Sequence, residues 1–305
     1  MVKVFGQKKT NELSILIRLL VSLALIALLL GVWSWWHFIK SEPKRVFWNA
    51  IDNALQTSSF SRETIETQNT QKTDQKLYVN TSPKAIAQGT NEVTQTGVNP
   101  FRVVTSEAGN PTSDFVKYDY VKTSQPTSSG KPADFTSVLN IWGKDVSPNK
   151  SVTSGQLYNQ SVLGVLPFGR LNIDDRRQLI KLIKDKNVMK VDYNTVSRTI
   201  AHGRPTYTFS VSVNAEAYIG MLKQYADSVG LTQLKQTNPA DYRDTPALSF
   251  KFTIDVWTQQ ITKVSYVNGL RNEFYGSYGL RTTPTDLPKN AIDINELQQR
   301  VRALE

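Results

Sequence analysis

Few residues in this chain could carry out chemistry, and their spacing favours structural roles. The sequence holds two histidines, and only His202 lies outside the long apolar segment near the N-terminus. His202 precedes Gly203, Arg204 and Pro205 in a predicted hairpin turn, where an exposed histidine is common. A serine, threonine or cysteine nucleophile needs a positioned base beside it. No G-x-S-x-G, P-loop or H-E-x-x-H pattern places His202 in that role.

Two pairs of acidic residues are the other candidates for catalysis or metal binding. Paired carboxylates can hydrolyse glycosides or hold a cation when their side chains converge. Asp174 and Asp175 are adjacent, so their side chains diverge, and the first turn of a helix is an electrostatically favourable place for both. Asp241 and Asp244 are predicted to lie in a loop. We therefore predict that the chain is not an enzyme and has no metal site and no cofactor.

Composition narrows the function classes further. The 305 residues include no cysteine, which excludes disulfides, thiolate catalysis and lipidation through a thiol. The formal charge is +10, and residues 1–40 hold five basic residues and one acidic residue, which leaves +6 for the remainder. Basic residues there are interspersed with acidic ones, unlike the basic stripe of a nucleic-acid binder. We expect no nucleic-acid partner.

One segment near the N-terminus has the length and composition of a membrane span. Residues Leu19 to Ile39 are almost all apolar, and 21 residues of helix would extend about 31 Å. Trp33, Trp35 and Trp36 at one end resemble an interfacial belt, and their bulk disfavours a signal-peptidase site. We expect a signal-anchor helix at residues 15–40, a short cytoplasmic tail at 1–14 and one extracytoplasmic domain at 41–305. This predicts a single-pass protein of the cell membrane.

The rest of the chain must position any site, and its periodicity indicates an α+β domain. Strand-rich stretches are interrupted by helices without regular strand-helix alternation, which is typical of antiparallel sheet. Residues 123–132 and 143–155 are predicted to be loops. The expected elements are a helix over 46–55, several strands within 58–122, a helix capped by Asn172, strands near 189–193 and 207–213, a helix from Asn214 to Gly230, strands over 248–256, 261–266 and 270–278, and a helix over 294–304.

Aromatic and β-branched residues alternate along the later strands, beside a helix that carries Met221. Two interpretations remain open, because the wall of a ligand cavity and a filled core have the same periodicity. The side chains fill the core in one interpretation. They enclose a ligand in the other.

Local patterns in the C-terminal third resemble a known group of exported carriers. The strand with Phe250, Phe252 and Ile254 ends at Asp255, turns through polar residues and returns through Ile261 and Val264. Residues 275–279, Leu287 and Pro288 are similar to the closing segment of the same group. Over residues 46–290 the chain resembles the LolA/LppX/LprG-like lipid and lipoprotein carriers.

That resemblance implies a fold and a function. The fold is a curved antiparallel half-barrel covered by helices, here preceded by one transmembrane helix. The implied function is binding or local transfer of lipid or acyl chains in the cell envelope, with membrane lipids or lipoproteins as partners. The alternative is a non-enzymatic module that binds other envelope proteins and has a filled core. The residues implied to form the cavity wall are Phe209, Val211, Met221, Leu222, Phe250, Phe252, Ile254, Val264 and Tyr266.

Overall fold

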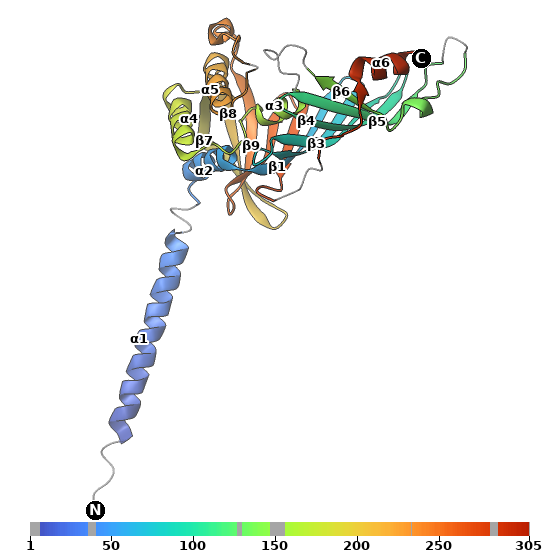
Figure 1. The fold of residues 1–305 in the computed structure, drawn as a ribbon. Helices are drawn as coiled ribbons and strands as arrows, with labels where there is room; N and C mark the ends of the chain where they lie inside the picture. Colours follow the sequence, from blue (N-terminus) through green and yellow to red (C-terminus); the bar gives the residue numbers. More distant parts are fainter. Residues whose placement is uncertain are drawn as a thin grey trace, which may run out of the picture. The chain divides into compact units, whose positions relative to one another are not determined.

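A computed structural model describes residues 7–35, 41–126, 130–146, 156–232, 234–280 and 286–304, with the backbone alone described at residues 7–17, 19, 33 and 146. Figure 1 shows the elements in chain order. The helices are α1 (Gln7–Ser34), α2 (Pro43–Gln56), α3 (Gln156–Val162), α4 (Ile173–Asp185), α5 (Ala215–Ser228) and α6 (Ile294–Arg302). The strands are β1 (Ser59–Gln68), β2 (Gln71–Asn80), β3 (Ile86–Gln95), β4 (Phe101–Asn110), β5 (Ser113–Thr123), β6 (Trp142–Val146), β7 (Met189–Ala201), β8 (Arg204–Val213), β9 (Leu248–Asp255), β10 (Gln260–Tyr266), β11 (Arg271–Gly276) and β12 (Ile292–Asp293).

All of these strands belong to one sheet, and the predicted α+β class is confirmed. The strand order is β12-β6-β5-β4-β3-β2-β1-β11-β10-β9-β8-β7, and every neighbouring pair is antiparallel except β12 with β6. β1 lies beside β11, so the early hairpins and the late hairpins join at the middle of the sheet. The result is a large, open, curved sheet.

The predicted starts of α4 and α5 are confirmed, and in each helix an asparagine side chain satisfies free amides of the first turn. The helix predicted over 46–55 begins earlier, at Pro43. Asn172 Oδ1 accepts hydrogen bonds from the backbone N–H groups of Asp174 and Asp175, at 3.0 and 2.9 Å. Asn214 Oδ1 accepts from the N–H of Ala217 at 2.9 Å. Such caps need no distant partner, so sequence alone can predict them.

Residues 143–155 were expected to form a loop, and that prediction is wrong at its start. Residues 142–146 form β6, which pairs with β5, and β12 then adds to β6 in parallel. β6 contains a glycine and charged residues and is short, so it has little strand periodicity of its own. Its pairing with β5 supplies the order that its sequence does not predict.

The chain divides into two compact units, Met1–Val46 and Phe47–Glu305. Among the residues searched in the described part of the chain, no helix is long and apolar enough to cross a membrane. The transmembrane anchor at 15–40 therefore stays a prediction. Of its predicted interfacial residues, Trp35 is exposed, the side chain of Trp33 is not described, and Trp36 lies outside the described residues.

Candidate functional site

The core of the second unit lies where the sheet strands β7 to β10 meet helices. Phe209 of β8 is opposite Phe252 of β9, and the ring of Phe47 in α2 lies 5.3 Å from the first and 6.1 Å from the second. All three side chains are fully buried. Helices α2, α4 and α5 are on the same side of this part of the sheet in Figure 1. This region is filled by its own side chains.

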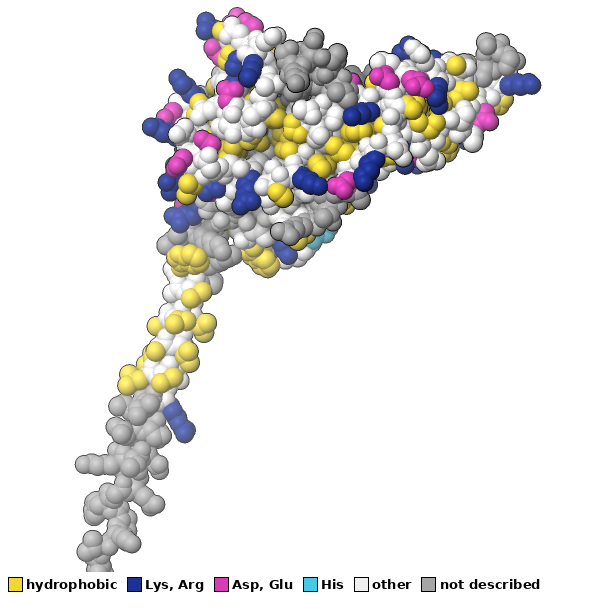
Figure 2. Space-filling model, viewed as in Figure 1, with side chains coloured by type: hydrophobic (Ala, Val, Ile, Leu, Met, Phe, Trp, Pro, Cys, Tyr) yellow, Lys and Arg dark blue, Asp and Glu magenta, His cyan; other side chains and the backbone are white. Residues whose placement is uncertain are grey.

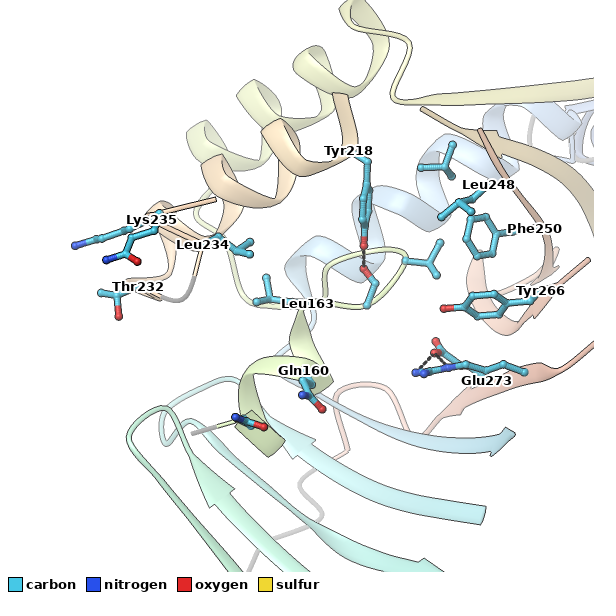
Figure 3. A pocket seen from close by; sticks show the side chains of 16 residues that line it. Gln160, Leu163, Tyr218, Thr232, Leu234, Lys235, Leu248, Phe250, Tyr266 and Glu273 are labelled. Carbon is cyan, nitrogen blue, oxygen red and sulfur yellow. Dashed lines mark hydrogen bonds and ion pairs between the residues drawn. The ribbon is translucent and has the colours of Figure 1, made fainter. Parts of the chain in front are cut away.

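A cavity of about 1060 Å³ lies beside this filled core (Figure 3). Its lining comes from α3, the segments after α3 and α5, one face of α5, and strands β8 to β11. Leu248 and Lys235 of the lining are exposed, so the cavity is open to solvent there. The lining residues are Gln156, Gln160, Leu163, Gly164, Val165, Val213, Tyr218, Thr232, Leu234, Lys235, Gln236, Leu248, Phe250, Tyr266, Arg271 and Glu273.

The nine residues implied as a cavity wall are distributed between this cavity and the core. Phe250 and Tyr266 line the cavity, with their rings edge to face and 4.9 Å apart. Val211 and Phe250 also line a smaller pocket of about 660 Å³. The others are buried and do not line the large cavity: Phe209, Met221, Leu222, Phe252, Ile254 and Val264. Lipid contact by any of the nine stays a prediction.

The lining of the large cavity has an apolar side and a polar side. Figure 3 labels the apolar side chains of the lining, Leu163, Leu234, Leu248 and Phe250. It shows Tyr266 next to Phe250, and Glu273 next to Tyr266. The face seen in Figure 2 carries hydrophobic side chains in a band, with basic side chains around it. An amphiphilic molecule fits such a lining better than a purely apolar one, because its polar end would otherwise lose hydrogen bonds.

A buried ion pair forms the polar end. Glu273 is 1% exposed, and its Oε1 lies 2.7 Å from Nη2 of Arg271 and accepts a hydrogen bond from Arg271 Nε at 2.9 Å. The hydroxyl of Tyr275 donates to Glu273 Oε2. Burial raises the pKa of Tyr275 well above its ordinary value, so this hydroxyl stays a donor. The carboxylate is satisfied inside the protein and is not a free base.

Tyr218 supports the apolar side. The N-cap at Asn214 begins α5, and Tyr218 follows one turn later with its hydroxyl 2.5 Å from the carbonyl oxygen of Gly164, to which it donates. Burial raises the pKa of Tyr218, so the phenol is protonated and the bond persists at neutral pH. This bond ties α5 to the segment that follows α3.

The polar surface continues onto the early strands. Arg62 of β1 donates from Nη1 to the carbonyl oxygen of Gln160 at 3.1 Å, and from Nη2 to Gln75 Oε1 at 3.5 Å. Gln75 in turn donates to Glu107 Oε2 at 2.9 Å. Burial raises the pKa of Glu107. A row of polar side chains therefore crosses β1, β2 and β4 next to the cavity.

Some polar atoms near the cavity have no protein partner. Within the described residues, Arg62 Nε, Thr64 Oγ1 and the cavity-lining Thr232 Oγ1 are buried and make no hydrogen bond. An unpartnered buried polar atom is costly. A polar ligand group or water is the ordinary remedy for such an atom.

The residues first considered for catalysis take structural positions. His202 has a φ of 50° and is exposed in the β7–β8 turn. Asp241 Oδ1 accepts a hydrogen bond from Asn238 at 3.2 Å in a short exposed helix. Among the described residues no group of three or more histidine, aspartate or glutamate side chains could hold a metal ion.

Sequence reasoning missed most of the lining. Tyr218 falls within the predicted helix from Asn214 to Gly230, and Leu163, Leu234, Arg271 and Glu273 had no assigned role. One signal was available: Arg271 and Glu273 alternate with Tyr275 in a strand, which directs all three to one face. A charged pair on the face that also holds a buried tyrosine points to a polar site.

Similarity to known proteins is confined to solved structures. No protein-family model matches the chain, and no curated protein matches it. LprF from Mycobacterium bovis is similar with a TM-score of 0.41 and 11% identity, over 81% of this chain and 96% of LprF. The Mycobacterium tuberculosis lipoprotein LppX is similar with a TM-score of 0.35 and 10% identity, over 79% of this chain and 94% of LppX. LppX is one of the carriers that the sequence resembles; at these values, neither likeness assigns a ligand.

Proposed function

We propose that the chain binds an amphiphilic lipid in the large cavity, for presentation or local transfer in the cell envelope. The single observation that carries the proposal is the cavity of about 1060 Å³ with an apolar side at Leu163, Leu234 and Phe250 and a polar end at Arg271 and Glu273. Each buried CH₂ of an acyl chain contributes about 0.8 kcal/mol, so partial enclosure is sufficient for binding. No covalent chemistry is involved.

The polar end favours lipids whose headgroup does not need a free charge on the protein. Arg271 is paired with Glu273 at 2.7 Å and lies 3.6 Å from Glu66, so its charge is already compensated. The unpartnered Thr232 Oγ1 offers an uncharged hydrogen-bonding group in the lining. We expect the acyl part to lie against Phe250 and the polar part to face Arg271.

We also propose that α1 anchors this domain in the membrane, with the N-terminus in the cytoplasm and the second unit outside. The support is a 28-residue helix whose described leucine, isoleucine and valine side chains are exposed, among them Leu20, Leu25 and Leu30 at 57–60%. Exposed apolar side chains on successive turns are stable in lipid and costly in water. Protease added to intact cells should remove the domain, and its resistance would contradict this topology.

Photo-crosslinking tests the lipid-binding proposal on the full chain. The chain would be reconstituted into vesicles with a phospholipid that carries a diazirine in its acyl chain, and crosslinked peptides identified by mass spectrometry. We expect crosslinks in the peptides of Leu163 and Phe250. Leu163→Trp should narrow the cavity and lower that yield at least about fivefold. Ile173→Trp, at a 51% exposed position of α4 outside the lining, is the matched control.

A second candidate function is a protein-interaction module of the envelope. The observation that favours it is the filled core around Phe47, Phe209 and Phe252, which needs no ligand. In this case crosslinks would be confined to the apolar residues of α1, and Leu163→Trp would change nothing. The same experiment therefore separates the two candidates.

A further inference from the structure

Three exposed apolar side chains lie at consecutive strand connections along one edge of the sheet. Ile200, the next-to-last residue of β7, is 79% exposed; Trp257 in the β9–β10 turn is 50% exposed, and Leu280 after β11 is 61% exposed. A single exposed apolar residue is ordinary, whereas several on one edge indicate a contact surface.

Backbone pairing and hydrogen bonds join the three connections. Ile200 is opposite Pro205 in the β7–β8 pair, and the carbonyl oxygen of Pro205 accepts a hydrogen bond from the N–H of Val256 at 2.9 Å. On the other side, the hydroxyl of Tyr278 donates to the carbonyl oxygen of Ile261 at 2.5 Å. The residues thus occupy neighbouring strand ends, about 4.8 Å per strand apart. We call Ile200, Trp257 and Leu280 the apolar edge.

The turn that carries Trp257 is held in place. Asp255 Oδ1 accepts hydrogen bonds from the N–H groups of Trp257 and Thr258, at 2.8 and 2.9 Å. Asn53 of α2 donates to the carbonyl oxygen of Gln259 at 2.8 Å. A fixed turn that leaves an indole half exposed pre-organises that indole for a partner.

Two arginine side chains lie close to the apolar edge. Arg204 in the same hairpin end is 55% exposed, with Nη1 3.5 Å from Asp255 Oδ2. Arg198 lies over the ring of Tyr207 at 5.2 Å. Tryptophan next to arginine is the composition that settles at the headgroup depth of a bilayer.

We propose that the apolar edge is a membrane-contact surface that inserts Ile200, Trp257 and Leu280 among the lipid headgroups. The inference rests on the anchoring part of the proposed function, and adds a second attachment that orients the domain. The opposite edge of the sheet also has exposed apolar residues, but Leu248 there lines the cavity of about 1060 Å³ and Val267 lines the pocket of about 660 Å³. Val98 at that edge is 84% exposed and lines none of the described pockets.

Spin labelling of the full chain tests whether the apolar edge contacts the membrane. Because the sequence has no cysteine, one introduced cysteine gives a single labelling site. Ile200→Cys, Leu280→Cys and the matched control Val98→Cys would each carry a nitroxide, in vesicles of phosphatidylcholine and phosphatidylglycerol. We expect the collision ratio of oxygen to a water-soluble nickel chelate to be at least about twofold higher at 200 and 280 than at 98. Trp257→Ser in the Ile200→Cys background should lower that ratio.

The outcomes separate the two proposals. One outcome is that the chain floats with the vesicles while the labels at 200, 280 and 98 are equally exposed to the nickel chelate. That result would overturn the contact surface and leave the anchor intact. A chain that does not float with vesicles would overturn both. Lipid binding in the cavity is read independently by photo-crosslinking.

Discussion

Nη2 of Arg271 lies 2.7 Å from Oε1 of Glu273, and the glutamate is 1% exposed while the arginine side chain is 34% exposed. The carboxylate of Glu273 is therefore removed from water, whereas the guanidinium of Arg271 remains partly hydrated. Removing one member of a buried pair leaves the other charge uncompensated, which costs more than the pair contributes.

Glu273→Gln should destabilise the fold for this reason. We expect the free energy of unfolding to fall by about 2–3 kcal/mol, below the range for fully buried pairs because water reaches Arg271. Urea unfolding measures the change. Glu66→Gln, at 3.6 Å from the same guanidinium and 43% exposed, should cost less than about 1 kcal/mol. Equal losses in the two variants would contradict the assignment of Glu273 as the buried partner.

Asp114 should make stability depend on pH. Burial raises its pKa from 3.8 to about 6, although the backbone N–H groups of Gln156 and Leu157 donate to its carboxylate at 2.8 and 3.2 Å. Between these two pKa values the folded chain binds more protons than the unfolded chain, so the contribution of Asp114 to stability is present below pH 4 and declines as pH rises to about 6.

Asp114→Asn should flatten that decline. Urea unfolding at pH 4 and pH 6.5 gives the comparison, and Glu107, whose pKa burial also raises, keeps a decline of the same sign in the variant. A wild-type chain whose stability rises through this window, or a variant with an unchanged slope, would show that Asp114 does not titrate in this way.

Local features of this fold were predictable and pairings across the chain were not. Asn172 and Asn214 begin α4 and α5 through contacts two or three residues away, which sequence reveals. Arg62 faces Tyr275 because β1 pairs with β11, more than 200 residues away. Nothing near either residue encodes that pairing, so the position of Arg62 beside the polar end of the cavity could not be derived from sequence.

The cavity wall was equally hard to separate from the core. Phe250 and Phe252 share one strand, one face and one residue type, and both are buried. Only the position of the segments after α3 and α5 leaves space beside Phe250, and those segments have no periodicity to interpret.

Two glycines should respond in opposite directions to alanine. A Cβ on Gly89 in β3 would lie 1.7 Å from the carbonyl oxygen of Lys76, so Gly89→Ala must displace β2. We expect a loss of about 2–4 kcal/mol in urea unfolding. A Cβ on Gly220 in α5 meets nothing within 4 Å, so Gly220→Ala should gain about 0.5–1 kcal/mol from helix propensity. A tolerated Gly89→Ala would mean that β2 and β3 are further apart than described.

Phe250 and Phe252 allow stability and lipid binding to be separated. Phe252 is fully buried and its ring lies 6.1 Å from that of Phe47, so Phe252→Ala opens a cavity in the core and should cost about 3–5 kcal/mol. It removes no side chain from the lining of the large cavity. At a temperature where the variant stays folded, photo-crosslinking to the diazirine phospholipid should therefore match the wild type.

Phe250→Ala should lower both the stability and the crosslinking to lipid. Phe250 lines the cavity, and its ring packs on that of Tyr266 with 4.9 Å between the ring centres. We expect a smaller loss of stability, about 2–3 kcal/mol, since the truncated side chain faces an existing space that already lacks contacts. Crosslinking at the Leu163 peptide should fall as well, and Phe250→Leu should restore most of both. A fall in crosslinking with Phe252→Ala but not with Phe250→Ala would place the lipid in the filled core and overturn the proposed site.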